Sequence, residues 1–319
     1  MDSPACFQAI YKHVGQQKID VDVYLPSPQN SKRPVLINIH GGAFMLGSSK
    51  MVNRDQVQDC LNRGWIVLAP NHRLCPQVNL LEGPIQDCRD LLAWVYDGGL
   101  EREINETAQS RVIPDIVIPD IDHVFAFGTS SGGTLALCLG FGVPRPVAGI
   151  YDMYGPCNFS DSFWTTKLPH LKVPAGLSES LMNKVFEECP VPITGGVSLE
   201  GQSTGPPDFS DPRQAYALTR LANGTLLDAI FPSKDWDLVD PARNISSYFP
   251  PTFIAHGTED SKVPIGLSRE LIRILKDHGV HCGMSEIPEE DHTFAAKMKV
   301  GSRTWELQRL GFDFLEYLI

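Results

Sequence analysis

The chain has 319 residues, of which 42% are hydrophobic and 20% are charged, and its formal net charge is -11. This composition is typical of a globular protein and excludes collagen-like, disordered and coiled-coil chains. The acidic balance disfavours nucleic acid as a partner, because phosphate binding needs a basic face. We therefore expect a small-molecule substrate, and the sequence leaves the oligomeric state open.

The sequence gives no sign of a membrane or secretory segment. No run approaches 18 apolar residues, so no membrane span is expected. The first residues lack a basic region followed by an apolar one, so we expect no secretory signal and a cytoplasmic location. The eight cysteines form no Cys-x-x-Cys pair and mostly lie among apolar residues, which favours buried thiols over disulfides or zinc ligands.

The first half of the chain alternates short apolar runs with helical patterns. Uninterrupted runs such as PVLINIH and WIVLA are typical of buried strands in a parallel sheet. The alternation predicts an α/β fold, with a mostly parallel central sheet flanked by helices. In chain order we expect strands at 19–25 and 34–40, a helix at 52–63, a strand at 65–69, a helix at 85–95, a polar excursion at 101–122, a strand at 123–128, a helix at 132–139 and a strand at 147–151.

The regular pattern breaks at residues 155–248, which are rich in proline and glycine. Because the alternation resumes afterwards, we interpret this segment as a cap or lid inserted into a single domain that comprises residues 1–319. Within the insertion we expect helices at 177–189 and 211–231. After it we expect a strand at 251–256, a helix at 265–278, a strand at 281–286 and a closing helix at 293–318.

The strongest local motif is G-x-S-x-G at residues 128–132, between a predicted buried strand and a helix of small residues. A serine on such a sharp turn exposes its hydroxyl, and the small flanking residues let the backbone fold tightly. The following helix also directs its amide end at the reaction centre. We predict that Ser130 is a nucleophile; the alternative is a glycine-rich turn without a catalytic role.

An activated serine needs hydrogen-bond donors for the oxyanion that forms after its attack. Residues 40–44 (HGGAF) stand at the end of the buried strand 34–40, and a glycine pair there lets backbone N–H groups approach a substrate oxygen. The predicted donors are the amides of Gly42, Ala43 and Ser131. An ordinary glycine turn is the alternative.

The two partners of the serine are predicted on later loops. Asp260 follows strand 251–256 and is the preferred acid, with Glu259 as its competitor and a helix cap as the alternative. His292 follows strand 281–286, and it is the one histidine of nine that comes after both the serine and the acid on such a loop. The order serine, acid, histidine is the one expected on this fold. A helix-cap histidine is the alternative.

With these motifs the chain resembles the α/β-hydrolase superfamily, and within it the esterases similar to hormone-sensitive lipase (α/β-hydrolase fold-3). The resemblance rests on residues 40–44, 72–77 (HRLCPQ) and 128–133, and it extends over nearly the whole chain. Ala43 replaces the usual third glycine of the oxyanion loop, and Thr129-Ser130-Ser131 replaces the usual Asp-Ser-Ala. The divergent insertion is also similar to hydrolases that accompany fungal secondary-metabolite pathways.

The resulting prediction is a carboxylesterase-type serine hydrolase that cleaves an ester of a small apolar molecule through an acyl-enzyme, without a cofactor or a metal. A non-hydrolytic biosynthetic enzyme for acyl transfer, cyclisation or condensation is the main alternative, since fold does not fix function. A peptidase and a catalytically inactive binder are weaker ones. Aromatic residues could line the pocket or simply pack the cap on the sheet: Phe44, Phe159, Phe163, Trp164, Phe231 and Trp236.

Overall fold

The structure, a computed structural model, describes residues 6–27, 31–111, 117–196 and 207–319. These residues form an eight-stranded sheet in the order β1-β2-β4-β3-β5-β6-β7-β8. β1 and β2 are antiparallel to each other, β2 is antiparallel to β4, and the remaining pairs are parallel. The strands are β1 (Cys6–Val14), β2 (Gln17–Tyr24), β3 (Lys32–Ile39), β4 (Ile66–Pro70), β5 (Ile118–Thr129), β6 (Gly149–Met153), β7 (Thr252–Gly257) and β8 (Cys282–Ile287).

Three inner strands are buried along their whole length, which explains why their sequences are largely apolar. Every residue of β4, β6 and β7 is buried, as expected for strands covered on both faces. The predicted mostly parallel sheet is confirmed. β1 was not predicted, because a bulge between Ile10 and Lys12 interrupts the alternation that marks a strand in the sequence.

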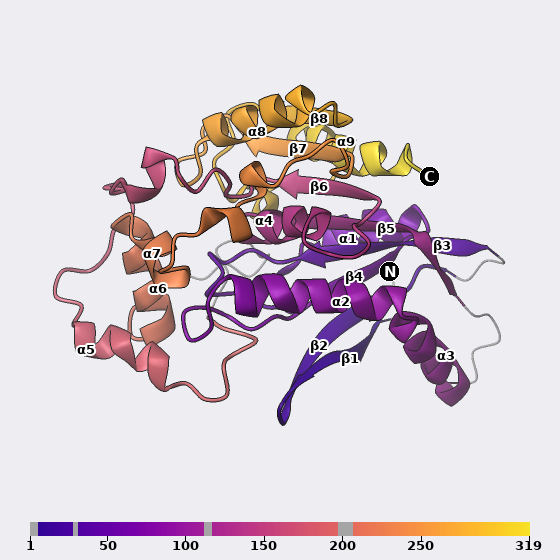
Figure 1. Ribbon diagram of the computed structural model, residues 1–319, viewed down its shortest axis with the longest axis horizontal. Coiled ribbons are helices and arrows are strands. Elements are labelled where there is room, and N and C mark those ends of the chain that lie inside the picture. The colour runs from indigo at the N-terminus through magenta and orange to yellow at the C-terminus, as the bar shows by residue number, and fades with distance from the viewer. Residues whose placement is uncertain (1–5, 28–30, 112–116, 197–206) are drawn as a thin grey trace.

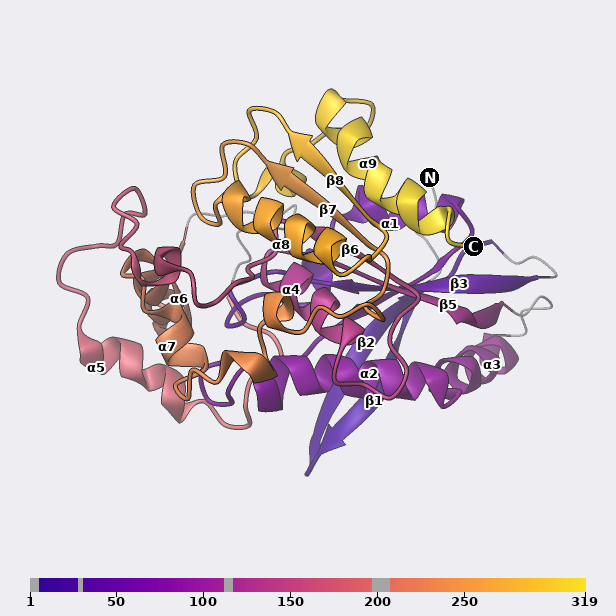
Figure 2. The same cartoon turned by 45° about the horizontal axis from the view of Figure 1, so that its top comes forward.

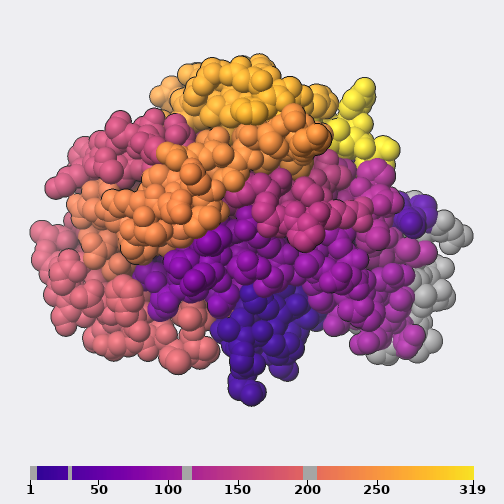
Figure 3. All heavy atoms as spheres, viewed as in Figure 1, coloured from indigo at the N-terminus to yellow at the C-terminus, as the bar shows by residue number. Residues whose placement is uncertain are grey.

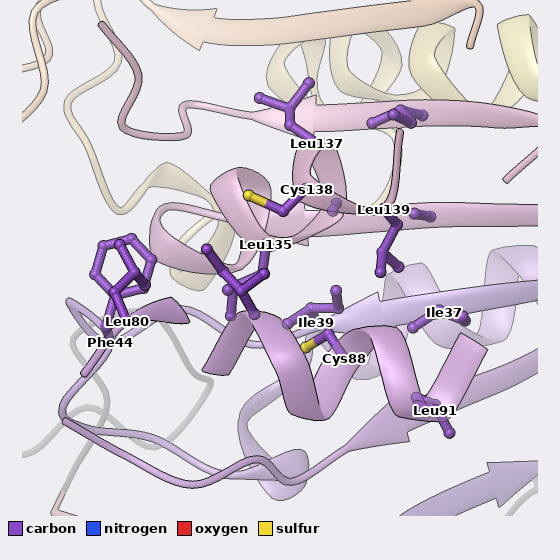
Figure 4. Close-up of a cluster of buried hydrophobic side chains, with 14 of the residues drawn as sticks. Ile37, Ile39, Phe44, Leu80, Cys88, Leu91, Leu135, Leu137, Cys138 and Leu139 are labelled. Atoms are coloured by element: carbon purple, nitrogen blue, oxygen red, sulfur yellow. The ribbon is translucent and has the colours of Figure 1, made fainter. Parts of the chain in front are cut away.

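Two layers of helices cover the sheet (Figure 2). α1 (Arg54–Asn62) and α9 (Arg303–Glu316) pack on one face over an aromatic core that includes Trp65, Phe127 and Phe312. The other face is covered by α2 (Gln86–Tyr96), α4 (Ser131–Leu137) and α8 (Ile265–Asp277). Figure 4 shows part of this second core, where side chains of α4 and the turn after it gather with those of β3 and α2.

The predicted polar excursion at 101–122 is wrong for most of its length. Residues Gly99–Arg111 form α3, and β5 already begins at Ile118. α3 buries Leu100 and Ile104 but presents mostly polar and charged side chains elsewhere, so its apolar stripe is too narrow to stand out in the sequence. Residues 112–116 of the predicted excursion lie outside the described residues.

Between β6 and β7 the chain forms a series of short helices, most of them at the end of the sheet toward which β6 and β7 point (Figure 1). The salmon and orange spheres of this segment lie at the left of Figure 3. The helices are η4 (Ser162–Thr165), α5 (Glu179–Met182), η5 (Asn183–Glu187), α6 (Pro212–Ala222), α7 (Leu226–Ile230), η6 (Trp236–Leu238) and η7 (Pro241–Arg243). The single helix predicted at 211–231 is interrupted at Gly224, whose φ of +66° lies in the left-handed region and ends α6. Residues 197–206 of the predicted insertion lie outside the described residues.

The predicted closing helix at 293–318 is also divided. A short turn, η8 (Phe294–Ala296), is followed by Gly301 at a φ of +80°, and Ser302 then caps α9 by accepting a hydrogen bond from the Trp305 amide. Among the described residues, no helix combines the length and the apolar character that crossing a membrane requires.

Candidate active site

Ser130 lies on the sharp turn between β5 and α4, with φ 50° and ψ -124°. A positive φ is strained for a residue with a Cβ and persists only where the surroundings fix it. Here the Ser130 amide donates to the Met153 carbonyl at 2.9 Å, and the Ser130 carbonyl accepts from the Gly133 amide at 2.8 Å. These two bonds hold the serine at the carboxyl end of β5 between its neighbouring strand and its own helix.

The glycines of the motif are required by close backbone contacts. A Cβ on Gly132 would lie 2.1 Å from the Ile39 carbonyl oxygen, and a Cβ on Gly128 would lie 2.1 Å from the Gly132 oxygen. The first helical turn therefore packs directly on the end of β3, which ends at the HGGAF segment. This contact explains how two motifs almost 90 residues apart in the sequence come to flank one pocket.

His292 lies between Ser130 and Asp260. Its Nε2 is 2.9 Å from the Ser130 Oγ, and its Nδ1 is 2.7 Å from the Asp260 Oδ2. Ser130 and His292 are buried, and the Asp260 side chain is fully buried, so water competes little for these contacts. Glu259, the competing acid, is exposed. The structure thus brings together Ser130, Asp260 and His292, the three residues proposed from the sequence.

Asp260 is held on both carboxylate oxygens. Its Oδ1 accepts the amides of Lys262 at 2.9 Å and Val263 at 2.8 Å, and its Oδ2 lies 3.0 Å from the His256 Nε2. Burial by itself raises the pKa of Asp260, but the charge of His292 and the hydrogen bonds from the two histidines outweigh it and hold the pKa well below its usual range. Asp260 is therefore an ionised partner for an imidazolium at His292.

Two residues around the histidine were not predicted from the sequence. His256, at the end of β7, contacts Asp260 and also has its Nδ1 2.8 Å from the Ser268 Oγ. Tyr154, at the end of β6 with a φ of 48°, packs its buried ring 4.8 Å from the His292 ring. The sequence does offer one indication for both residues: they lie directly at the carboxyl ends of predicted parallel strands, where ligand-binding and active sites are commonly found on such sheets.

The predicted oxyanion loop has an unusual backbone. Gly42, Ala43 and Phe44 have φ values of 126°, 54° and 63°, and the Gly42 carbonyl accepts from the amides of Met45 at 3.1 Å and Leu46 at 2.8 Å. Gly42 and Ala43 line the same pocket as Ser130 and His292. Ser131, the third predicted donor, is buried at the first position of α4 and is not among the pocket-lining residues.

A pair of stacked histidines lies beneath this loop. The rings of His40 and His72 are parallel within 9° with centroids 4.7 Å apart, and the His40 Nδ1 lies 2.7 Å from the Gly41 carbonyl oxygen. Both side chains are buried, and burial lowers the pKa of His72 to about 4. The HGGAF and HRLCPQ segments are therefore joined by a stack in which His72 is neutral at physiological pH.

The pocket above Ser130 has largely apolar walls and an empty volume of about 580 Å³, counting the part open to solvent. Lys262 also lines it, and α6 contributes Ala217, Leu218 and Leu221. Of the six aromatic residues considered from the sequence, Phe44 and Trp164 line this pocket. The other four pack instead: Phe159 and Phe231 contact Trp236, and Phe163 contacts Trp164. The packing interpretation thus holds for most of the cap aromatics.

Comparison with protein-family models gives two partial matches. Residues 21–112 match a family described as BD-FAE, and residues 231–317 match the prolyl oligopeptidase family. Among solved structures, esterase 2 of Thermogutta terrifontis, in a form phosphoramylated by tabun, covers 99% of this chain and 95% of that one with a TM-score of 0.65 and 17% identity. A Staphylococcus aureus protein of unknown function has a TM-score of 0.65 at 20% identity, covering 98% of this chain and 99% of that one.

Curated relatives are fungal synthases. Non-reducing polyketide synthase Preu6 of Preussia isomera is 31% identical over 96% of this chain, and 5-methylorsellinic acid synthase of Aspergillus terreus is 30% identical over 92% of it. This chain spans only 14% and 12% of the length of these two relatives. The similarity therefore concerns one region of much larger proteins.

Strand order and the structural neighbours show the α/β-hydrolase fold, and the partial match to the prolyl oligopeptidase family supports an enzyme of the serine-hydrolase type. The predicted fold class is confirmed. The two partial family matches and the esterase neighbours agree with this fold.

Proposed function

We propose that this protein is a carboxylesterase-type serine hydrolase that cleaves a carboxylic ester of a small apolar molecule. The observation that carries the proposal is the position of His292, whose two ring nitrogens lie 2.9 Å from the Ser130 Oγ and 2.7 Å from the Asp260 Oδ2. A hydroxyl, an imidazole and an ionised carboxylate in this arrangement are the components of nucleophilic acyl transfer.

In the proposed reaction, the Ser130 oxygen attacks the ester carbonyl while the His292 Nε2 takes the serine proton. Asp260 holds the imidazole by its Nδ1–H and stabilises the imidazolium. The histidine then donates the proton to the leaving alcohol, and an acyl-enzyme remains on Ser130. A water molecule, deprotonated by His292, then attacks this acyl group. The bond to the Ser130 oxygen breaks, His292 returns the proton to that oxygen, and the carboxylic acid leaves.

The negative charge that develops on the carbonyl oxygen requires donors fixed in advance. We assign this role to the amides of Gly42, Ala43 and Ser131. Gly42 and Ala43 face the pocket, and Ser131 begins the helix that follows the nucleophile. Ala43 supplies the same N–H as a glycine, so its methyl narrows the approach without removing a donor. Loss of one such donor costs about 3 to 4 kcal/mol of transition-state stabilisation.

The segment 155–248 acts as the lid of this site in our proposal, within one catalytic domain. α6 supplies one wall of the pocket through Ala217, Leu218 and Leu221, and Trp164 and Leu226 of the same segment also line it. Apolar walls favour uncharged acyl groups, because they offer few partners to a charged one.

A second candidate, acyl transfer or cyclisation in a biosynthetic pathway, is favoured by the synthase names of the curated relatives. The same acyl-enzyme would then be attacked by a hydroxyl or carbon nucleophile of a substrate instead of water. The two candidates share Ser130, His292 and Asp260 and differ in the second half of the reaction.

The test is steady-state hydrolysis of p-nitrophenyl acetate and butyrate by the purified protein at neutral pH. We expect turnover, and a loss of at least about a thousandfold in Ser130→Ala, because the three residues act as a unit. Ser131→Ala is the matched control: it removes the neighbouring hydroxyl, keeps its amide, and should retain activity within severalfold. An acyl-enzyme that forms but is released only to an added alcohol would favour the second candidate, and unchanged turnover in Ser130→Ala would contradict both.

A further inference from the structure

Arg213 joins the lid segment to the loops that flank the catalytic serine. It is the second residue of α6, and it is only 3% exposed. Its Nη1 donates to the carbonyls of Met45 at 2.8 Å and Cys75 at 2.7 Å. Its Nη2 donates to the Gln77 Oε1 at 2.8 Å and to Glu188, and its Nε donates to the same Glu188 carboxylate at 3.0 Å. One guanidinium therefore links α6 to three other stretches of the chain.

A buried guanidinium is costly unless its donors are satisfied. The donors of Arg213 are satisfied by one carboxylate and three neutral oxygen acceptors. These acceptors lie in directions that match the N–H groups of the planar guanidinium. A lysine would place three donors at a single point and could not bond all of these acceptors at once. The arrangement is thus specific for arginine.

The loop that Arg213 contacts needs external support. Ala43 and Phe44 both have positive φ values, a strained conformation that persists only where surrounding contacts hold it. The Cys75 amide donates to the Phe44 carbonyl at 3.0 Å, while the Cys75 carbonyl accepts from Arg213. Arg213 therefore binds the residue after the strained pair and also the residue that supports Phe44 from the other side.

Backbone hydrogen bonds between residues 192–195 of the lid segment and the loops after β3 and β4 strengthen the link that Arg213 makes. Gly47 and Gly195 form an antiparallel bridge. The Gly47 amide nitrogen lies 2.6 Å from the Gly195 carbonyl oxygen, and the Gly195 nitrogen lies 3.0 Å from the Gly47 oxygen. The Leu74 amide donates to the Pro192 carbonyl at 2.8 Å. A Cβ on Gly195 would lie 2.7 Å from the Arg213 Cδ, so the bridge and the guanidinium are packed against each other.

From these contacts we propose that Arg213 is a positioning residue for the oxyanion loop. Through it the lid segment holds the Gly42 and Ala43 amides in their reactive conformation, in addition to enclosing the substrate. The inference rests on the proposed function, because it assumes that these amides bind the oxyanion. α6 carries Arg213 and, one turn later, the pocket-lining Ala217. The same helix would therefore contact the substrate and position the oxyanion loop.

The test compares Arg213→Lys and Arg213→Met with the wild-type protein in p-nitrophenyl butyrate hydrolysis, well below the melting temperature of each variant. Donors to the oxyanion act in the transition state and little in the ground state, so we expect kcat to fall about tenfold to a hundredfold with KM changed less than about threefold. Lysine should not rescue kcat, since it cannot bond the Met45 and Cys75 carbonyls together with Gln77.

The matched control is Arg220→Met, on the same helix. Arg220 stacks on Tyr216 and lies 3.7 Å from Glu179, within the lid segment, so its loss should leave kcat and KM unchanged. A merely structural Arg213 would lower the melting temperature but leave kcat per folded molecule at the wild-type value, and that result would overturn the inference. If Arg213→Met does not fold, the kcat per folded molecule of Arg213→Lys decides between the two roles. A wild-type protein without esterase turnover would instead count against the proposed function.

Discussion

Ser130, His292 and Asp260 meet because three different strands of the sheet end at one edge. Each residue follows its strand closely. Two of them are fixed by bonds to the backbone: the Ser130 amide donates to the Met153 carbonyl, and the Asp260 Oδ1 accepts from two following amides. This fixed geometry allows the acyl transfer proposed above to proceed with little reorganisation.

Replacement of Asp260 by asparagine tests which acid orients the histidine. The amide cannot hold the imidazole in the required tautomer or stabilise its charge, so we expect kcat to fall by about 10⁴-fold. Esterase assays on Asp260→Asn and on the neighbouring Glu259→Gln should differ sharply, since Glu259 is exposed. Equal losses in the two variants would contradict the assignment.

Asp152 is a buried carboxyl outside the proposed reaction. Its Oδ1 accepts the Gly155 amide at 2.9 Å, whereas its Oδ2 has no hydrogen-bond partner among the described residues. Burial raises the pKa of Asp152 to about 7. The neutral acid is therefore favoured in the folded protein, and its contribution to stability is complete below the unfolded pKa near 4 and is lost as the pH rises through 7.

Asp152→Asn should remove this pH dependence. We expect the free energy of unfolding of the variant, relative to wild type, to rise by up to about 4 kcal/mol between pH 4 and pH 8. Urea unfolding at these two pH values measures the difference. A difference that does not change with pH would show that Asp152 titrates normally.

At the scale of elements, sequence patterns predicted the strands better than the helices. Continuous apolar runs located β3, β4, β6 and β7 to within a few residues, because burial on both faces leaves little ambiguity. Helix ends were missed where a single left-handed glycine, such as Gly224, interrupts an otherwise continuous pattern. The positions of Ser130, Asp260 and His292 were predicted from motif and order. The contact of Arg213 with Met45 spans 168 residues, and no local pattern could reveal it.

Ala217 on α6 tests the pocket wall. It is 1% exposed and lines the pocket, so a larger side chain must occupy substrate space. We expect Ala217→Leu to lower kcat/KM about tenfold or more for p-nitrophenyl octanoate and to leave acetate hydrolysis within severalfold of wild type. Thr219→Ala, on the same helix but not among the pocket-lining residues, is the control. An equal loss for both chain lengths would show that the acyl group does not bind along α6.

At the scale of the whole molecule, residues from both halves of the chain pack together in the same hydrophobic cores. The face covered by α1 and α9 joins Trp65, Phe127 and Tyr151 of the first half to Phe312 near the end of the chain. The Phe312 ring makes edge contacts with all three at centroid distances of 6.5, 5.0 and 5.1 Å. The segment between β6 and β7 is built into the other core, so we regard the lid and the sheet as one folding unit.

Phe312→Ala should reveal this coupling. The residue is fully buried, and its truncation is expected to lower the free energy of unfolding by about 3 to 5 kcal/mol. Far-ultraviolet circular dichroism and esterase activity, followed along the same urea titration, should be lost together. A loss of activity at markedly lower urea than the loss of helix signal would contradict a single unit.

Covalent labelling tests the central claim most directly, because it reports on the nucleophile without any assumption about the natural substrate. The protein is treated with a fluorophosphonate at neutral pH, and the mass of the intact chain and of its peptides is measured. We predict one added label, located on Ser130, that is retained in Ser131→Ala and absent from Ser130→Ala and strongly slowed in His292→Ala. A wild-type protein that remains unlabelled, or a label that persists in Ser130→Ala, would contradict the account.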